Sequence, residues 1–458
     1  MRTEVRKDAV PQTVQRLCAR LREGGHGAWV VGGGLRDLLR GEAPKDWDIA
    51  TSATPEQVTR LFRKVIPTGV QHGTVTVLLG GGQYEVTTLR GEGAYSDGRR
   101  PDSVHFVNDL DEDLARRDFT VNAIAFDPGT GRLIDPFGGL DDLQARCLRT
   151  VGDPRARFGE DGLRVLRAAR FVGTLEFELE AATEAAISAA LPTFAQVSAE
   201  RVRDEWLKAL ASRQPSRAFE VMRRTGILTV SCPDLVALHG CTQNRFHAYD
   251  VWGHTMACMD ACDRDPLHRL AGLLHDVGKP ATRELSEKTS DYTFYNHERV
   301  GADMAKGWLR RYRFSKQETS QVVHLVRHHL ICYTPEWTDA AVRRFVKRVG
   351  PDAIAPLLAL GRADVMAKGL PADKDLAQLD ELQARIAAIT AQGAALSVRD
   401  LAISGRDLMQ ELQLRPSPTI GRVLDRLLER VLDAPELNER QALLTLAQEL
   451  VVQEAESP

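Results

Sequence analysis

The sequence lacks any apolar run long enough to cross a bilayer, and its first residues, MRTEVRKDAVPQ, lack the apolar core of a signal peptide. It also lacks a disulfide framework, because its seven cysteines are scattered and odd in number. A net charge of −3 excludes a global basic field, so any nucleic-acid partner must be held by a local basic surface. We therefore expect a cytoplasmic protein with no membrane partner. Its 458 residues are too many for one ordinary core.

The pattern of apolar residues divides the chain into two parts. Up to about residue 145, strand-like stretches such as AWVV, TVTVLL and QYEVTTL alternate with glycine turns and helical segments. From residue 146 onward, almost every segment has helical period. This predicts an α+β fold, in which an N-terminal domain with a small mixed β-sheet is followed by an all-α region.

The segment VVGGGLRDLLRGEAPKDWDIATSATP carries the first candidate site. Asp46 and Asp48 are separated by one residue, so on a strand their side chains would share a face. Two such carboxylates repel each other unless a cation lies between them, and Mg²⁺ prefers carboxylates together with substrate phosphates. Glu85, in YEVTTL, is a candidate third carboxylate. The glycine turn and Arg36 can approach a triphosphate, which predicts in-line attack on an α-phosphate.

Each of these features is weak when taken alone. A D-x-D pair is common on protein surfaces, and GGGLRD is not a dinucleotide fingerprint because Asp37 stands where the third glycine should be. The combination is more specific. With LARRDFTVNAIAFD, LIDPFGGLDDL, FGEDGLRVLRAARF and SAERVRDEWLKAL in the same order, it closely resembles the class II tRNA nucleotidyltransferases and bacterial poly(A) polymerases over roughly residues 25–225.

This resemblance assigns roles to several residues. It implies that Asp46 and Asp48 carry Mg²⁺. It also implies that Gly33 and Arg36 of the glycine segment contact the nucleotide, and that Arg117 of the R-R-D motif does the same.

A third motif, EDGLRVLR, offers a means of choosing a base. We expect it on a helix, where Asp161 and Arg164 share a face. Cytosine and adenine each present an amine donor beside a ring-nitrogen acceptor, which a carboxylate and a guanidinium can read. An ion pair on the helix surface is the commoner explanation of an isolated D-x-x-R, but the resemblance favours base selection. Arg167 and Arg170, further along the helix, would then face phosphate or base.

Histidines and aspartates in the second half predict another metal site. His254, His275-Asp276 and Asp364 follow the order H…HD…D, which resembles the HD phosphohydrolase superfamily. Imidazoles and carboxylates together suit a divalent transition metal, and we expect Mn, Ni or Co. His297 and one of His328 or His329 are candidate ligands of a second metal. Taken singly, each histidine is more often a core or surface residue.

The two resemblances together imply a domain order and a function. The implied function is template-independent addition of CCA, from CTP and ATP, to the 3′ end of tRNA, with the acceptor arm as the bound partner. The HD site would add a phosphohydrolase or phosphodiesterase activity. The domains expected are a nucleotidyltransferase (palm) domain at 1–145, a helical neck with nucleotide-selecting and RNA-binding helices at 146–230, an HD domain at 231–385 and a tRNA-binding tail at 386–458.

Three alternatives stay open on the sequence alone. An enzyme that adds only the terminal A is one, although the loop RGEGAYSDGRRPDSVHF resembles the flexible segment of A-incorporating members. A poly(A) polymerase is another, although IPTGVQHGTVTV and the C-terminal LAISGRDLM resemble the CCA-adding branch. The third is an HD phosphohydrolase whose N-terminal half merely binds RNA. The sequence does not indicate an oligomeric state.

Overall fold

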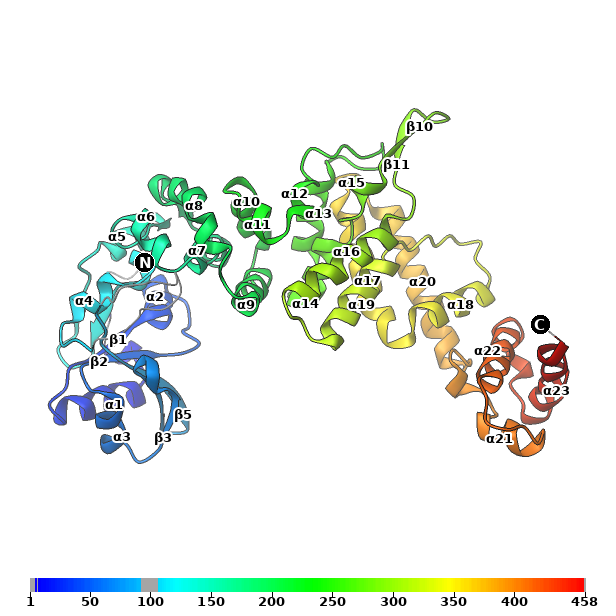
Figure 1. The fold of residues 1–458 in the computed structure, drawn as a ribbon, viewed down its shortest axis with the longest axis horizontal. Helices are drawn as coiled ribbons and strands as arrows, with labels where there is room; N and C mark the ends of the chain where they lie inside the picture. Colours follow the sequence, from blue (N-terminus) through cyan, green and yellow to red (C-terminus); the bar gives the residue numbers. More distant parts are fainter. Residues whose placement is uncertain (1–4, 6, 92–105, 457–458) are drawn as a thin grey trace. The chain divides into compact units, whose positions relative to one another are not determined.

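The computed structural model describes residues 5, 7–91 and 106–456. The chain forms two compact units, residues 1–236 (unit 1) and 237–458 (unit 2). Figure 1 shows unit 1 in blue to green and unit 2 in green to red. Most of the loop RGEGAYSDGRRPDSVHF, namely residues 92–105, lies outside the described residues. Among the helices that are described, none is both long and apolar enough to cross a membrane.

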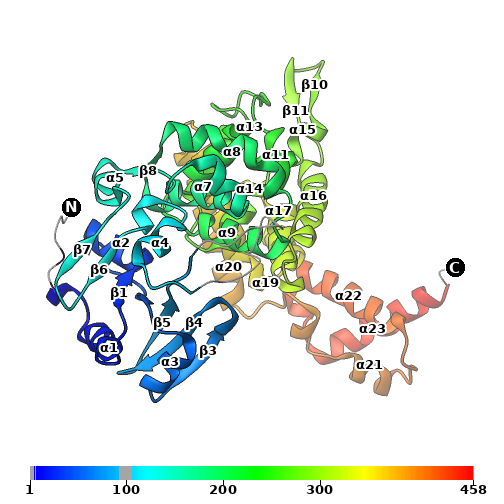
Figure 2. The ribbon, with the colours of Figure 1, turned by 60° about the vertical axis from the view of Figure 1, so that its left-hand side comes forward.

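Unit 1 contains the predicted mixed sheet, which has seven strands in the order β3-β4-β5-β2-β1-β6-β7. The strands are β1 (Ala28–Val31), β2 (Asp48–Thr51), β3 (Val65–Gly69), β4 (Thr74–Leu79), β5 (Gly82–Thr88), β6 (Ala125–Asp127) and β7 (Arg132–Ile134). Strands β2 and β5 pair in parallel, whereas the other neighbours are antiparallel. Figure 2 shows β3, β4 and β5 side by side. A glycine turn joins β4 to β5 in one hairpin, and a PGTG turn joins β6 to β7 in another.

The glycine run differs from its predicted form. Instead of making a free turn after β1, it forms the first turn of helix α2 (Gly32–Arg40). Val31 is extended and Gly32 has a φ of 75°, which glycine adopts at little cost. The helix ends at Gly41 in the left-handed conformation. The first backbone N–H groups of α2 therefore lie at the end of the central strand β1.

Helices cover the sheet of unit 1 and continue beyond it. They are α1 (Gln12–Glu23), α2, α3 (Pro55–Leu61), α4 (Leu110–Ala115), α5 (Gly139–Ala145), α6 (Pro154–Glu160), α7 (Leu163–Leu175), α8 (Ala181–Phe194), α9 (Ala199–Leu210), α10 (Pro215–Arg224), α11 (Ile227–Ser231) and α12 (Pro233–Val236). Helices α9 and α10 pack against α7. Trp206 and Phe219 meet edge to face with ring centroids 5.0 Å apart, which joins α9 to α10. A short parallel pair, β8 (Cys147–Leu148) and β9 (Glu178–Leu179), also lies here.

Unit 2 is mainly helical, as the sequence predicts. Its helices are α13 (Val251–Ala261), α14 (Pro266–Leu274), α15 (Lys279–Thr282), α16 (His297–Arg311), α17 (Lys316–His328), α18 (Asp339–Val349), α19 (Pro351–Ala367), α20 (Asp373–Ala391), α21 (Gly405–Glu411), α22 (Pro418–Asp433) and α23 (Arg440–Glu456). The sequence pattern does not predict a small hairpin, β10 (Glu284–Ser286) and β11 (Asp291–Thr293), because strands of three residues leave no readable alternation. Figures 1 and 2 show this hairpin projecting from the helices of unit 2.

The last helices of unit 2 have a core of their own. Leucines and valines of α22 and α23 pack together with Leu408 of α21, and the buried members include Leu427 and Leu443. Arg343 of α18 is largely buried and donates from Nε to the backbone carbonyl of Leu432 at 2.7 Å. This hydrogen bond satisfies a carbonyl in the last turn of α22 and ties the C-terminal helices to α18.

Candidate functional site

The structure brings the three predicted carboxylates of unit 1 to one place. Asp48 is the first residue of β2 and pairs in register with Glu85 of the parallel strand β5. Asp46 lies two residues earlier, before the strand begins. Burial, followed by the charges of Asp46 and Glu85, raises the pKa of Asp48 from 3.8 to about 6. Such mutual repulsion is the electrostatic signature of a site that accepts a cation, so the donor set fits Mg²⁺.

Two glycines are required where α2 meets this acidic cluster. A Cβ at Gly32 would lie 2.7 Å from a carboxylate oxygen of Asp48, and a Cβ at Gly34 would lie 2.3 Å from the carbonyl oxygen of Asp46. Any larger residue at position 34 would have to move the backbone of Asp46. The glycine run therefore allows the start of α2 to approach the carboxylates closely.

Arg36 and Gly33 are neighbours on α2. The Arg36 Nη2 atom is 3.5 Å from the position that a Cβ of Gly33 would occupy. Its guanidinium is nearly buried, donates from Nη1 to Asn122 Oδ1 at 2.8 Å and pairs with Asp37. Arg117 donates from Nη1 to the backbone carbonyl of Asn122 at 3.1 Å. Asn122 lies in the LARRDFTVNAIAFD motif but has no role predicted from the sequence, and it orients both predicted nucleotide-binding arginines.

Asp161 and Arg164 do not share a helix face as predicted. Helix α6 ends at Glu160 and α7 begins at Leu163. Asp161 lies in this break between the two helices and has extended backbone angles. Its carboxylate accepts a hydrogen bond from the backbone N–H of Leu163 at 3.0 Å and forms an ion pair of 2.6 Å with Arg201. Gly162 sits at the start of α7, where a Cβ would clash with the backbone of Thr193.

Arg164 has its own set of partners. It forms an ion pair with Glu160 and donates to the backbone carbonyls of Arg157 and Arg116, at 2.9 and 3.0 Å. A guanidinium has five N–H donors, so these contacts fix its plane without exhausting its donors. Since Asp161 and Arg164 are held by different partners, the simple surface ion pair is not formed.

Arg167 and Arg170, which stay predicted contacts of phosphate or base, lie in an internal charge network. Arg167 donates to Asp118 Oδ2 from Nε and Nη2, at 2.8 and 2.6 Å, and Arg170 pairs with the buried Glu205 of α9 at 2.5 Å. Burial alone would raise the pKa of Asp118, but Arg167 and Asn122 lower it below its usual value. Both guanidinium groups also lie against the Phe171 ring. Their immediate role is to fix α7.

The cluster of Asp46, Asp48 and Glu85 should lower the stability of the metal-free protein. Because the pKa of Asp48 is raised to about 6, the ionised form is disfavoured in the folded state, and the cost develops as pH rises from about 4 to about 6. We expect Asp48→Asn to raise the free energy of unfolding of unit 1 by about 1–3 kcal/mol at pH 8 with chelator present. The gain should shrink toward pH 4.

Urea unfolding at both pH values tests this expectation. The exposed Asp141 of α5 provides the control, since Asp141→Asn should change stability by less than about 0.5 kcal/mol. A gain of equal size at pH 4 and pH 8 would show that repulsion among the carboxylates is not its cause.

A second cluster lies in unit 2, where α13, α14 and α19 meet. His254 Nε2 is 3.2 Å from His275 Nε2, 2.9 Å from Asp364 Oδ1 and 3.4 Å from Asp276 Oδ2. The geometry thus brings together the four residues of the predicted H…HD…D order. Both histidines and Asp276 are almost completely buried. Burial would raise the pKa of Asp364, but its hydrogen bond with His254 and the His275 charge lower it.

The opposite oxygen of Asp276 faces a second histidine pair. His297 Nε2 and His329 Nε2 lie 3.3 and 3.8 Å from Asp276 Oδ1 and 3.2 Å from each other. Each oxygen of the buried Asp276 carboxylate therefore lies near two imidazoles, those of His254 and His275 for Oδ2 and those of His297 and His329 for Oδ1. The cluster includes His329 in place of His328, whose ring lies 4.5 Å from that of His324.

Backbone contacts turn three of these imidazoles inward. The Nδ1 atoms of His275, His297 and His329 each lie 2.7 Å from a backbone carbonyl oxygen, those of Gly272, Phe294 and Val326. A donor at Nδ1 leaves the lone pair of the neutral ring at Nε2, which is the atom that points into the cluster. This arrangement is typical of histidine metal ligands.

The carboxylate of Asp276 gives a further test of fit. Neither of its oxygens makes a hydrogen bond of good geometry, although both are buried. The Lys279 ammonium lies 2.6 Å from Oδ2 and 2.6 Å from Gln243 Oε1. Burial would lower the pKa of His275, but Asp276 raises it to about 9. A buried carboxylate with imidazole nitrogens around both oxygens fits a pair of divalent transition metals.

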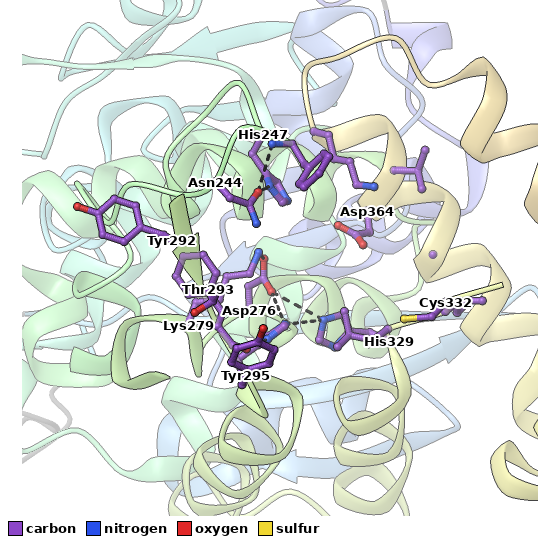
Figure 3. A pocket seen from close by; sticks show the side chains of 18 of the residues that line it. Asn244, His247, Asp276, Lys279, Tyr292, Thr293, Tyr295, His329, Cys332 and Asp364 are labelled. Atoms are coloured by element: carbon purple, nitrogen blue, oxygen red, sulfur yellow. Dashed lines mark hydrogen bonds and ion pairs between the residues drawn. The ribbon is translucent and has the colours of Figure 1, made fainter. Parts of the chain in front are cut away.

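A cavity of about 470 Å³ opens from this cluster. Figure 3 shows Asp276, His329 and Asp364 at the cavity, with Asn244 and His247 on one side and Tyr295 on another. His247 meets His254 edge to face at 5.0 Å, and burial lowers the pKa of His247 to about 3. A substrate could therefore reach the cluster from solvent through this cavity.

Three family models match successive parts of the chain. A poly A polymerase head domain matches residues 28–149, and the model described as "Probable RNA and SrmB- binding site of polymerase A" matches 176–238. A model of tRNA nucleotidyltransferase domain 2 matches residues 294–447.

Individual proteins agree with these matches. A CCA-adding enzyme of Lactobacillus delbrueckii subsp. bulgaricus is 48% identical over 233 residues, which are 51% of this chain and 57% of that protein. The CCA-adding enzyme of Geobacillus thermodenitrificans is 50% identical over 213 residues, 46% of this chain and 52% of that one. The matched region thus spans little more than half of these relatives. The crystal structure of the Bacillus stearothermophilus CCA-adding enzyme in complex with CTP has a TM-score of 0.71 at 29% identity, covering 97% of this chain and 99% of that chain.

Proposed function

We propose that the chain is a member of the family of tRNA nucleotidyltransferases and poly(A) polymerases, and that it adds CCA to the 3′ end of tRNA, using CTP and ATP without a nucleic-acid template. The observation that carries this proposal is the placement of Asp46, Asp48 and Glu85 at the start of α2. The CCA-adding activity and the bound CTP of the relatives support the choice of nucleotides.

Different residues of unit 1 would bind the triphosphate, its oxygens and the metal ion. Gly33 and the first N–H groups of α2 would cradle the triphosphate, and Arg36 and Arg117 would bind its oxygens. Asp46, Asp48 and Glu85 would hold Mg²⁺, which supplies Lewis-acid stabilisation of charge at the α-phosphate. The 3′-hydroxyl of tRNA would attack that phosphate in line and displace pyrophosphate.

Base selection would fall to the α6–α7 break. The Asp161 carboxylate would accept from the exocyclic amine of cytosine or adenine, and Arg164 would donate to the neighbouring ring nitrogen. Uracil and guanine present the reverse pattern and would leave both groups unpaired. The partners of Asp161, Arg201 and the Leu163 N–H, would hold the carboxylate ready before the base arrives.

One extension assay separates this proposal from its rivals. The protein is incubated with tRNA lacking its last three nucleotides, or with tRNA ending in CC, and with CTP, ATP or both. Addition of three residues when both are present supports CCA addition. A long A tail would indicate a poly(A) polymerase, and a single A added only to tRNA ending in CC would indicate an A-adding enzyme.

We propose a metal-dependent phosphohydrolase as a second activity, located in unit 2. The supporting observation is the buried Asp276, with imidazole nitrogens near both carboxylate oxygens. His254, His275 and Asp364 would complete one site, and His297 and His329 the other. Mn²⁺, Ni²⁺ or Co²⁺ held there would supply Lewis-acid chemistry toward a phosphate ester.

The test of this second activity is phosphate-ester cleavage. A 2′,3′-cyclic nucleotide should be opened by the wild-type protein with a divalent metal, and His275→Ala should abolish the reaction. If the wild-type protein is inert with each of Mn²⁺, Ni²⁺, Co²⁺ and Mg²⁺, the cluster serves folding and not hydrolysis.

A further inference from the structure

The mouth of the unit 2 cavity is lined with exposed aromatic side chains. Phe246 is 57% exposed and Tyr295 is 73% exposed, although both line a cavity that ends at buried metal-type ligands. Exposed apolar side chains that gather at one cavity are typical of a surface that meets a ligand. Phe246 precedes α13 and Tyr295 precedes α16, so two separate segments supply the aromatic rim, which we define as Phe246, Tyr292 and Tyr295.

Backbone hydrogen bonds tie the rim segments together. The Arg245 N–H donates to Asp291 Oδ2 on the β10–β11 hairpin at 3.2 Å. The Ala248 N–H donates to the Lys368 carbonyl, just beyond α19, at 2.8 Å. The segment around Phe246 is thus fixed to both the hairpin and the end of α19. The Phe246 part of the aromatic rim is therefore held in place before a ligand arrives, which lowers the ordering cost of binding.

Positive charge accompanies the rings. The Arg283 guanidinium stacks on the Tyr292 ring at 3.7 Å, and that of Arg245 lies 5.2 Å from the Phe246 centroid. Lys279 and Lys368 line the cavity itself, where they pair with Asp276 and Asp375. A purely apolar ligand would gain nothing from these cations, whereas single-stranded nucleic acids bind to aromatic faces that have positive charge beside them.

We infer that this cavity receives the 3′-terminal nucleoside of a single-stranded RNA, with its base stacked on the aromatic rim and its terminal phosphate at the histidine cluster. This inference rests on the proposed phosphohydrolase activity and specifies its substrate class. Tyr295 is the main stacking residue, because its side chain is more exposed than that of Phe246, and Tyr292 is half-buried. Phosphate esters without a base are poorer substrates because they cannot stack on the aromatic rim.

The test uses the full-length, Mn²⁺-loaded protein and two phosphomonoester substrates. One is the dinucleotide UpUp, which ends in a 3′-phosphate, and the other is glycerol 2-phosphate, which has no ring. Tyr295→Leu should lower kcat/KM for UpUp about tenfold, chiefly through KM, and leave glycerol 2-phosphate unchanged. Tyr295→Phe should restore UpUp cleavage. Leu285→Ala is the matched control, because Leu285 is 64% exposed on the hairpin but does not line the cavity.

The possible results are distinguishable. Equal losses on both substrates, or no loss on UpUp, would overturn base stacking while leaving the hydrolase in place. If the wild-type protein releases phosphate from neither compound but opens a 2′,3′-cyclic nucleotide, the inference fails while the hydrolase stands. If it does neither, both are refuted.

Discussion

Replacing Asp46 and Asp48 together with alanine should slow nucleotide transfer to tRNA by about 10³-fold or more. The two carboxylates would hold the cation that stabilises charge on the α-phosphate, and losing about 4 kcal/mol of such stabilisation corresponds to that factor. Single-turnover incorporation of CTP measures the effect, because product release then does not mask the chemical step.

A matched control separates this loss from general damage. Glu42 lies between α2 and β2 and its side chain is 56% exposed, so Glu42→Ala should stay within about twofold of wild type. Removing carboxylate repulsion should also stabilise the metal-free double variant. Loss of activity with increased stability would place the effect at the metal site, whereas loss of both would point to misfolding.

Changing His329 to alanine should remove one of two metals and nearly all phosphohydrolase activity, with a loss of about 10²-fold or more. His329 Nε2 points at the cluster from a ring anchored through Nδ1. Metal content measured by mass spectrometry should fall from two ions to one. Asp276→Asn should remove both metals, because the amide has one neutral oxygen in place of the two charged oxygens that would each bind a cation.

The adjacent histidine supplies the comparison for this prediction. His328 is next in sequence but faces His324, so His328→Ala should keep both metals and full activity. Equal loss of metal in His328→Ala and His329→Ala would mean that the variants act through helix α17 and not through ligation.

Sequence patterns identified most residues of both candidate sites because part of each site is contiguous in the sequence. The Gly33–Arg36 segment and the D-x-D pair are contiguous, and the strand β2 brings Asp48 beside Glu85 through ordinary parallel pairing. His275 and Asp276 are adjacent, and the packing of α13 and α19 on α14 brings His254 and Asp364 to them. The mixed sheet and the helical second half followed from hydrophobic period in the same way.

The missed features depend on contacts between distant residues. The partner of Asp161 is Arg201, forty positions away, and that of Arg170 is Glu205, thirty-five away, so a local pattern cannot reveal either pair. Asp161 leaves the predicted helix because Gly162 allows a close approach to the backbone of Thr193.

The choice between His328 and His329 also required the structure. Adjacent residues differ by about 100° around a helix, and only the packing of α17 decides which side chain faces inward.

The most direct test of the central claim, that side chains of unit 1 choose C and A, is sequencing of tRNA 3′ ends after extension with all four nucleoside triphosphates. Wild-type protein should append CCA alone. Asp161→Asn keeps the shape but adds amide donors, so incorporation of U relative to C should rise about 10- to 100-fold. An unchanged U-to-C ratio in Asp161→Asn, or a homopolymeric A tail from the wild-type protein, would contradict the account.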